Sequence, residues 1–182
     1  TLQSRIGSGV KRTEPSLRPG SLRPSIELRF PPRRGFVTRI ANMVRQFCRE
    51  LIGDGDGLSR VNMATHELVE NVVKYSAGGM CELRVEFRLD GPTPIVSIET
   101  ANDVGGEALE ALERHLVALQ QAPDPVAFYD RTIRASASRR QGSGLGLARI
   151  RAEGEMELSH RVAGGRITIR AESAIREVRW AG

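Results

Sequence analysis

Aromatic side chains are scarce in this 182-residue chain, where Phe, Trp and Tyr together make up 4% of the residues. Its basic segments therefore lack the interleaved aromatic rings on which single-stranded nucleic acids stack. Long apolar runs are missing as well, and none approaches the roughly 18 residues of a membrane-spanning helix. Because no signal peptide is visible either, we expect a cytoplasmic protein that does not enter a membrane.

Cysteine and histidine are equally rare. The two cysteines, Cys48 and Cys81, form no CxxC pair and have no histidine at metal-binding spacing. Both lie in apolar segments, so we expect buried structural thiols. The three histidines, His66, His115 and His160, do not accompany an evident nucleophile motif, which leaves a catalytic triad few candidates.

The remaining composition is that of one soluble globular domain with a tail: 40% of the residues are apolar and 27% are charged. Residues 1–24 are rich in Arg, Pro, Ser and Gly, and they predict a flexible tail. Part of the net charge of +5 lies in this tail. We interpret it as a solvated segment and disfavour a nucleic-acid binder, and we assign the domain to residues 25–182.

Hydrophobic periodicity predicts helices and strands in an order that favours an α+β two-layer sandwich over a parallel doubly wound sheet. The expected strands are 26–30, 81–89, 95–100, 156–162, 166–172 and 175–180. The expected helices are 36–51, a second one from an N-cap at Ser59 to Tyr75, 107–119 and 145–154. Residues 122–143 predict a long mobile loop, or lid, with a short helix near 125–133.

The second predicted helix has a polar face. At about 100° per residue, Glu67, Glu70, Asn71 and Lys74 fall within about 100° of arc, and the apolar residues lie opposite. A solvated face with ion pairs three and four residues apart is the plain interpretation. A zinc-protease HExxH motif fails because its second histidine is replaced by Glu70.

A second motif is the glycine pattern of Gly142, Gly144 and Gly146, between a polar loop and a helix. Glycines let the backbone approach phosphates, and a helix N-terminus offers free N–H groups. A dinucleotide-binding fingerprint requires a strand directly before the glycines, and here a polar loop precedes them. The sequence also has no GxxxxGK[ST] P-loop.

Together the two motifs are specific. Residues 65–76, THELVENVVKYS, resemble the N-box of the GHKL superfamily of gyrase, Hsp90 and histidine kinases, and residues 142–148, GSGLGLA, resemble its G2 box. The resemblance covers about residues 26–172 and implies the Bergerat type of two-layer sandwich, with a mostly antiparallel mixed sheet. It is closest to stand-alone bacterial anti-sigma-factor kinases, which often form homodimers.

The resemblance implies ATP and Mg²⁺ as ligands and gives each residue a role. Asn71 would bind Mg²⁺, Glu67 would be the general base, and Lys74 would meet phosphate oxygens. The remaining phosphate contacts would come from the lid and the glycine loop: Arg139, Arg140, Gly142, Ser143, Gly144, Leu145, Gly146 and Leu147. A histidine autokinase is disfavoured, because the chain has no room for a separate phosphoacceptor hairpin.

The adenine-binding G1 box departs from the superfamily pattern. Thr100 stands where its Asp is expected and Asn102 where its first Gly is expected, while Asp103 comes later. A Thr-x-Asn segment resembles the SiaB-like bacterial proteins. This resemblance implies a protein Ser/Thr kinase that phosphorylates a small partner, anti-anti-sigma (STAS-like) or similar, in a partner-switching pathway. The alternative is a non-enzymatic regulator of the same fold that sequesters its partner.

Overall fold

The computed structural model of the protein describes residues 23–89, 92–136 and 144–176. Within them lie five strands and five helices. The strands are β1 (Ser25–Phe30), β2 (Cys81–Arg88), β3 (Ile95–Asp103), β4 (Glu157–Ala163) and β5 (Arg166–Ala174). The helices are α1 (Gly35–Ile52), α2 (Asp56–Tyr75), α3 (Gly106–Gln121), α4 (Pro125–Ser136) and α5 (Leu145–Ala152).

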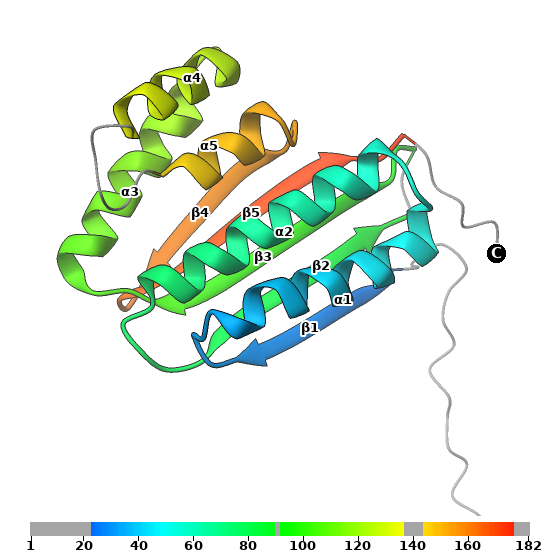
Figure 1. The fold of residues 1–182 in the computed structure, drawn as a ribbon, viewed down its shortest axis with the longest axis horizontal. Coiled ribbons are helices and arrows are strands. Elements are labelled where there is room, and N and C mark those ends of the chain that lie inside the picture. Colours follow the sequence, from blue (N-terminus) through cyan, green and yellow to red (C-terminus); the bar gives the residue numbers. More distant parts are fainter. Residues whose placement is uncertain (1–22, 90–91, 137–143, 177–182) are drawn as a thin grey trace, which may run out of the picture.

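The described strands form one sheet in the order β1-β2-β3-β5-β4, and every neighbouring pair is antiparallel. Helices α1, α2 and α5 lie over one face of this sheet, and α3 and α4 project past its end (Figure 1). The predicted two-layer α+β sandwich is therefore confirmed. The expected mixed sheet is fully antiparallel in these residues, because no crossover joins parallel neighbours.

Side-chain alternation explains why only one face is covered. In β2 the apolar side chains Leu83, Val85 and Phe87 are buried beneath the helices, whereas the alternate charged residues face the open side. The open face carries ion pairs between neighbouring strands: Arg29–Glu82 at 3.0 Å, Arg84–Glu27 at 3.2 Å and Arg170–Glu99 at 3.1 Å. A further pair, Arg88–Glu172 at 2.8 Å, joins β2 to β5 across β3. A face built this way stays solvated.

Helices α1 and α2 form the centre of the helical layer. Residues at helical spacing on each helix are buried against the sheet and against the other helix. The buried residues of α2 are Leu58, Val61, Ala64, Thr65, Leu68, Val69 and Val72. The predicted apolar face of this helix is confirmed.

The predicted N-cap of α2, Ser59, is four residues later than the observed one, Gly55. The helix begins at Asp56, after an extended Gly55, so that Ser59 lies inside its first turn. Its hydroxyl donates to the carbonyl of Gly55 at 3.2 Å, four residues back. A serine hydroxyl can hydrogen-bond to the backbone inside a helix as well as at its N-cap. The sequence alone did not distinguish these two positions.

The short helix predicted near 125–133 is confirmed as α4, a regular helix of 12 residues that extends to Ser136. Asp124 caps this helix, because its Oδ1 accepts hydrogen bonds from the backbone N–H groups of Val126 at 2.9 Å and Ala127 at 3.0 Å. Pro125 occupies the first helical position, where its missing N–H costs nothing. The rest of the predicted lid, residues 137–143, lies outside the described residues.

The ends of the domain also differ from prediction in detail. Pro24 already belongs to the sheet region, since its carbonyl accepts a hydrogen bond of 2.9 Å from the Phe87 N–H. Ile175 follows β5 outside any strand, although its N–H donates to the carbonyl of Pro94 at 2.8 Å. The remainder of the predicted strand 175–180 and the tail residues 1–22 lie largely or wholly outside the described part. No described helix has the length and apolar content to cross a membrane.

Candidate functional site

The polar stripe on α2 is divided between buried and exposed side chains. The Glu67 side chain is only 17% exposed, and Asn71 is half-buried one turn later. Glu70 is 58% exposed and lies 4.0 Å from the His66 ring nitrogen Nδ1. Lys74 is exposed, with its Nζ 5.1 Å from the centre of the Tyr75 ring. The inner edge of the stripe, Glu67 and Asn71, is therefore the part that another element covers.

That element is α5, at the end of the glycine loop. A Cβ placed on Gly146 would overlap the Oε2 atom of Glu67, so the carboxylate lies directly against the backbone of the first turn of α5. The other carboxylate oxygen, Oε1, accepts a hydrogen bond of 3.2 Å from Nη1 of Arg149. The fold thus brings together the two predicted motifs, which are far apart in the sequence.

Arg149 was not among the predicted site residues. Besides Glu67 it binds Glu153, whose Oε2 is 2.6 Å from its Nε. Burial, followed by the nearby Glu153 carboxylate, raises the pKa of the Tyr129 phenol on α4. Gly146, Arg149 and Glu153 are three and four residues apart, so a helical wheel of α5 could have placed them on one face.

Gly144 forms the turn into α5 in a conformation that favours glycine, with φ 61° and ψ 10°. Its carbonyl accepts a hydrogen bond of 3.1 Å from Nε2 of His115 on α3. The His115 ring occupies the space in which a Cβ on Gly144 would lie, and it packs 5.9 Å from the Phe128 ring. His115 therefore anchors the glycine turn to α3, a role that its isolated place in the sequence gave no sign of.

The anchoring by His115 predicts a loss of stability in acid. Burial, partly opposed by the hydrogen bond to Gly144, lowers the pKa of His115 below its ordinary 6.5. Below pH 6.5 the unfolded chain takes up this proton more readily than the folded one, so the free energy of unfolding should fall as pH decreases. Urea unfolding between pH 7.5 and 5 should show a shallower decline for His115→Phe. His66→Gln, which removes an exposed histidine, should retain the wild-type slope; an unchanged slope in His115→Phe would contradict this prediction.

Two buried polar atoms at this end of the molecule lack a hydrogen-bond partner within the described residues. They are Nδ2 of Asn71 and Oγ1 of Thr100, whose residue is only 1% exposed. An unsatisfied buried group of this kind costs about 1–3 kcal/mol, so each marks a position where a bound ligand or water is expected. Thr100 and Asn102 both point from β3 to the helix-covered face.

Asn71 and Thr100 lie at the same end of the sandwich. The N–H of Ala77, just after α2, donates to the carbonyl of Asp103 at the end of β3, at 2.8 Å. The residues present at this end of α2, an amide and a hydroxyl without a partner among the described residues, are of the types that would hold an ATP–Mg²⁺ group.

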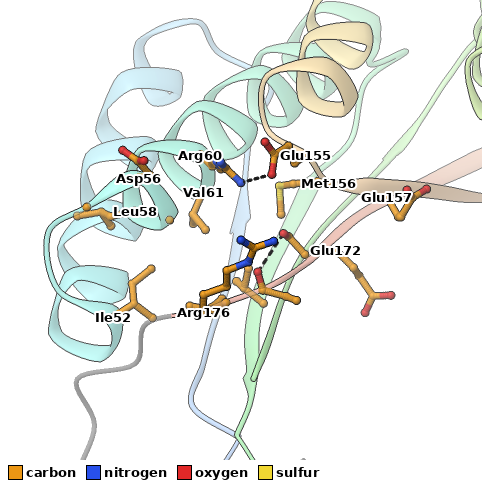
Figure 2. A pocket seen from close by; sticks show the side chains of 16 residues that line it. Ile52, Asp56, Leu58, Arg60, Val61, Glu155, Met156, Glu157, Glu172 and Arg176 are labelled. Atoms are coloured by element: carbon orange, nitrogen blue, oxygen red, sulfur yellow. Dashed lines mark hydrogen bonds and ion pairs between the residues drawn. The ribbon is translucent and has the colours of Figure 1, made fainter. Parts of the chain in front are cut away.

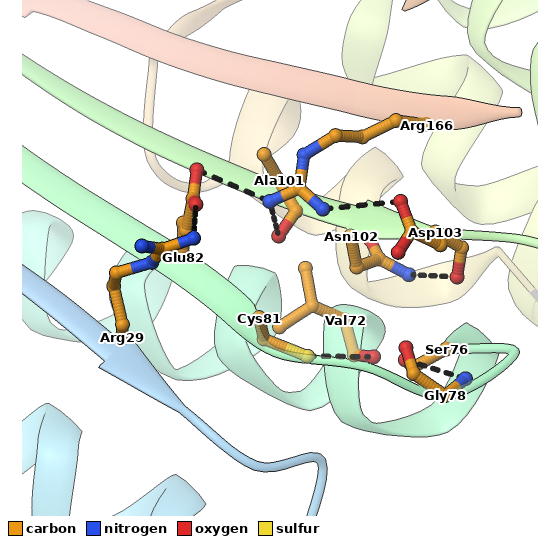
Figure 3. A network of polar contacts seen from close by, with 10 residues as sticks. All are labelled: Arg29, Val72, Ser76, Gly78, Cys81, Glu82, Ala101, Asn102, Asp103 and Arg166. Atoms are coloured by element: carbon orange, nitrogen blue, oxygen red, sulfur yellow. Dashed lines mark hydrogen bonds and ion pairs between the residues drawn. The ribbon is translucent and has the colours of Figure 1, made fainter. Parts of the chain in front are cut away.

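Asp103 does not join the other two predicted adenine residues. It lies on the opposite face of β3, where its Oδ1 is 3.1 Å from Nη1 of Arg166 (Figure 3). The same arginine reaches Glu82 at 3.1 Å. The alternation of a strand turns consecutive side chains to opposite faces, so Asn102 and Asp103 could not both face the helices. Asn102 donates from its Nδ2 to the Asp103 carbonyl at 3.3 Å.

The other predicted phosphate contacts divide into two groups. Leu145, Gly146 and Leu147 begin α5, and the Leu147 side chain is 1% exposed in the core, so it anchors the helix from within. Four of the predicted residues, Arg139, Arg140, Gly142 and Ser143, lie outside the described residues.

A pocket of about 630 Å³ lies elsewhere, at the N-terminal end of α2 (Figure 2). Its lining includes Leu58, Arg60, Glu155 and Met156, with Arg60 and Glu155 joined by an ion pair of 2.5 Å. At 1.5 Å per residue, Asn71 is about 15 Å further along the helix axis than Val61. This pocket is separate from the Glu67–Gly146 site. In the described residues, no cluster of three or more His, Cys, Asp or Glu side chains could hold a metal ion.

These observations define the class of protein. It is a two-layer α/β sandwich whose helix α2 carries a carboxylate and an amide, and the carboxylate contacts a glycine turn that begins a helix. No protein-family model matches the chain, and no curated protein matches its sequence.

A chain in the crystal structure of the SiaB-SiaC complex from Pseudomonas aeruginosa has a similar fold, with a TM-score of 0.54 and 19% identity. The match covers 81% of this protein and 89% of that chain. At this level of identity the likeness shows the fold, and it agrees with the fold that the SiaB-like resemblance implied.

Proposed function

We propose that the protein binds ATP with Mg²⁺ and transfers the γ-phosphoryl group to a serine or threonine of a small regulatory partner in bacterial partner switching. The observation that carries the proposal is the contact between Glu67 and the Gly146 backbone, because it unites a carboxylate base with a phosphate-binding turn. Phosphoryl transfer depends chiefly on positioning and on neutralising charge, and these residues are of the types that it needs.

Each part of the site has a stated task in this proposal. Asn71 would hold Mg²⁺, and the turn at Gly144 with the first residues of α5 would hold the phosphates. Bound Mg-ATP would supply the phosphoryl group, and its Mg²⁺ ion would offset the negative charge of the phosphates. Glu67 would take the proton from the attacking hydroxyl group. Thr100 and Asn102, on the inner face of β3, would recognise the base in place of the superfamily Asp.

The neighbouring fold supports a protein partner as the acceptor. The similar solved chain belongs to a complex of SiaB with SiaC, which is a second protein. By analogy, this protein would act on a small acceptor protein, with its hydroxyl presented to Glu67.

A second function is favoured by one observation: the G1 position carries Thr100, whose hydroxyl has no partner within the described residues, where the superfamily has a carboxylate. A weakened adenine contact would leave a regulator that sequesters its partner without chemistry. Such a regulator would bind its partner tightly and bind nucleotide weakly or not at all.

Titration calorimetry with Mg-ATP distinguishes the two functions. The kinase proposal predicts saturable binding of one nucleotide that weakens when EDTA removes Mg²⁺, and slow release of inorganic phosphate with water as acceptor. Asn71→Ala should lose the Mg²⁺ dependence of binding, whereas Asn62→Ala, which changes another half-buried amide of α2, should keep it. Absence of any nucleotide binding to the wild-type protein would refute the kinase proposal.

A further inference from the structure

Arg149 holds Glu67 in a defined arrangement. Its Nη1 donates to Oε1 of Glu67 at 3.2 Å, and its Nε donates to Oε2 of Glu153 at 2.6 Å. A guanidinium is planar and its donors are fixed relative to one another. With the Nε edge held by Glu153, the direction of the remaining donor toward Glu67 is set by α5 itself.

The Glu67 carboxylate is confined on its other side as well. Its Oε2 lies against Gly146, the second residue of α5, and its side chain is 17% exposed. Arg149 and Gly146 belong to the same short helix, so the carboxylate is held between the backbone and a side chain of a single rigid element. The orientation of the carboxylate relative to the glycine turn is therefore fixed by α5, and α2 contributes only the backbone position of Glu67.

The stabilising effect of this ion pair is not enough to explain such an arrangement. The Arg149 side chain is 43% exposed, and partly exposed pairs contribute little to the free energy of unfolding. The fixed orientation matters for the chemistry instead, because a displaced base loses much of its effect.

We propose that Arg149, held by Glu153, is the positioning residue of the Glu67 carboxylate, keeping it aligned with the glycine turn at the start of α5. The inference rests on the proposed function, in which Glu67 is the general base. Arg149 acts through Glu67 and requires no contact with the nucleotide.

The test compares Arg149→Gln and Arg149→Lys with a matched control, Arg60→Gln. Arg60 forms an ion pair of 2.5 Å with Glu155, which also joins α2 to the segment after α5 but lies at the other end of α2. The kinetics of phosphate release from Mg-ATP, with water as acceptor, give kcat and KM, and Mg-ATP affinity is measured by calorimetry. Urea unfolding of the ligand-free proteins completes a double-mutant cycle of Arg149→Gln with Glu67→Ala.

For Arg149→Gln we expect kcat to fall about 10-fold to 100-fold, in the range that misplacement of a catalytic group causes, with Mg-ATP affinity within about twofold of wild type. Arg149→Lys, which keeps the charge without the planar fork, should recover only part of the lost kcat. Arg60→Gln should leave kcat and Mg-ATP affinity unchanged. In the ligand-free cycle, Arg149→Gln and Glu67→Ala should be non-additive.

Other outcomes overturn the proposal. A rise in KM with unchanged kcat would make Arg149 a nucleotide-binding residue, and full recovery of kcat in Arg149→Lys would show that the charge of residue 149, and not its planar geometry, is what matters. Absence of phosphate release by the wild-type protein would contradict the proposed function instead. Even then the ligand-free cycle decides between the alternatives: additivity of the two substitutions would refute the positioning of Glu67 by Arg149, and coupling would support it.

Discussion

Glu67→Gln is expected to bind Mg-ATP as tightly as the wild-type protein but to release phosphate about 10²-fold to 10⁴-fold more slowly, the usual contribution of a general base. The new amide has nearly the shape of the carboxylate, and its oxygen can still accept the hydrogen bond from Arg149. It cannot take up a proton at neutral pH. Phosphate release and calorimetry on the same preparation measure the two effects separately.

Glu70→Gln is the matched control for this substitution. It makes the same chemical change on the same helix, three residues away, at a side chain that is 58% exposed. It should retain wild-type phosphate release, since it removes only the exposed contact with His66. Equal losses of activity in the two variants would contradict a specific role for Glu67, and unchanged activity in Glu67→Gln would contradict its role as the general base.

Gly144→Ala is expected to destabilise the protein strongly. The residue has φ 61°, where a side chain costs about 1–2 kcal/mol. Its new Cβ would also overlap the His115 ring, and overpacking of this kind costs about 1–3 kcal/mol more. The glycine turn can relieve the overlap only by moving away from α3, so Mg-ATP affinity should fall as well. Urea unfolding and calorimetry measure the two losses.

Gly164→Ala separates the two causes. Gly164 lies in the β4–β5 turn at φ 58°, but nothing lies within 4 Å of the position of its Cβ. This variant should show only the backbone cost and should bind Mg-ATP normally. Combining Gly144→Ala with His115→Ala should recover the part of the loss that the ring overlap causes. If Gly144→Ala and Gly164→Ala lose equal stability, His115 does not pack against the glycine turn in solution.

Helix and strand positions followed closely from local patterns. Alternation in β2 and helical spacing in α2 each reflect a single buried face, which the identity of the side chains fixes without knowledge of the neighbours. One helix start was wrong because a local group had two solutions: Ser59 bonds to Gly55 inside the helix rather than capping it.

The candidate site shows the same division. Glu67 and Asn71 were found on one helix face because their spacing is local, and the glycine turn was found from its residue types. Arg149 and His115 were missed, because each acquires its role only by contacting a residue distant in the sequence, Glu67 and Gly144 respectively. Asp103 was grouped with Thr100 and Asn102 by proximity in the sequence, whereas the pleat of β3 separates their faces.

The sequence by itself determined that a carboxylate and an amide share one face of α2, and that a glycine turn begins a later helix. These features depend on chain periodicity and on backbone freedom, which are properties of short segments. Only the tertiary structure decided that the carboxylate lies against that turn, and that Arg149 holds it and His115 fixes the turn. Such contacts depend on how α2, α3 and α5 pack beside one another over the sheet, and that arrangement is set by burial of the core as a whole.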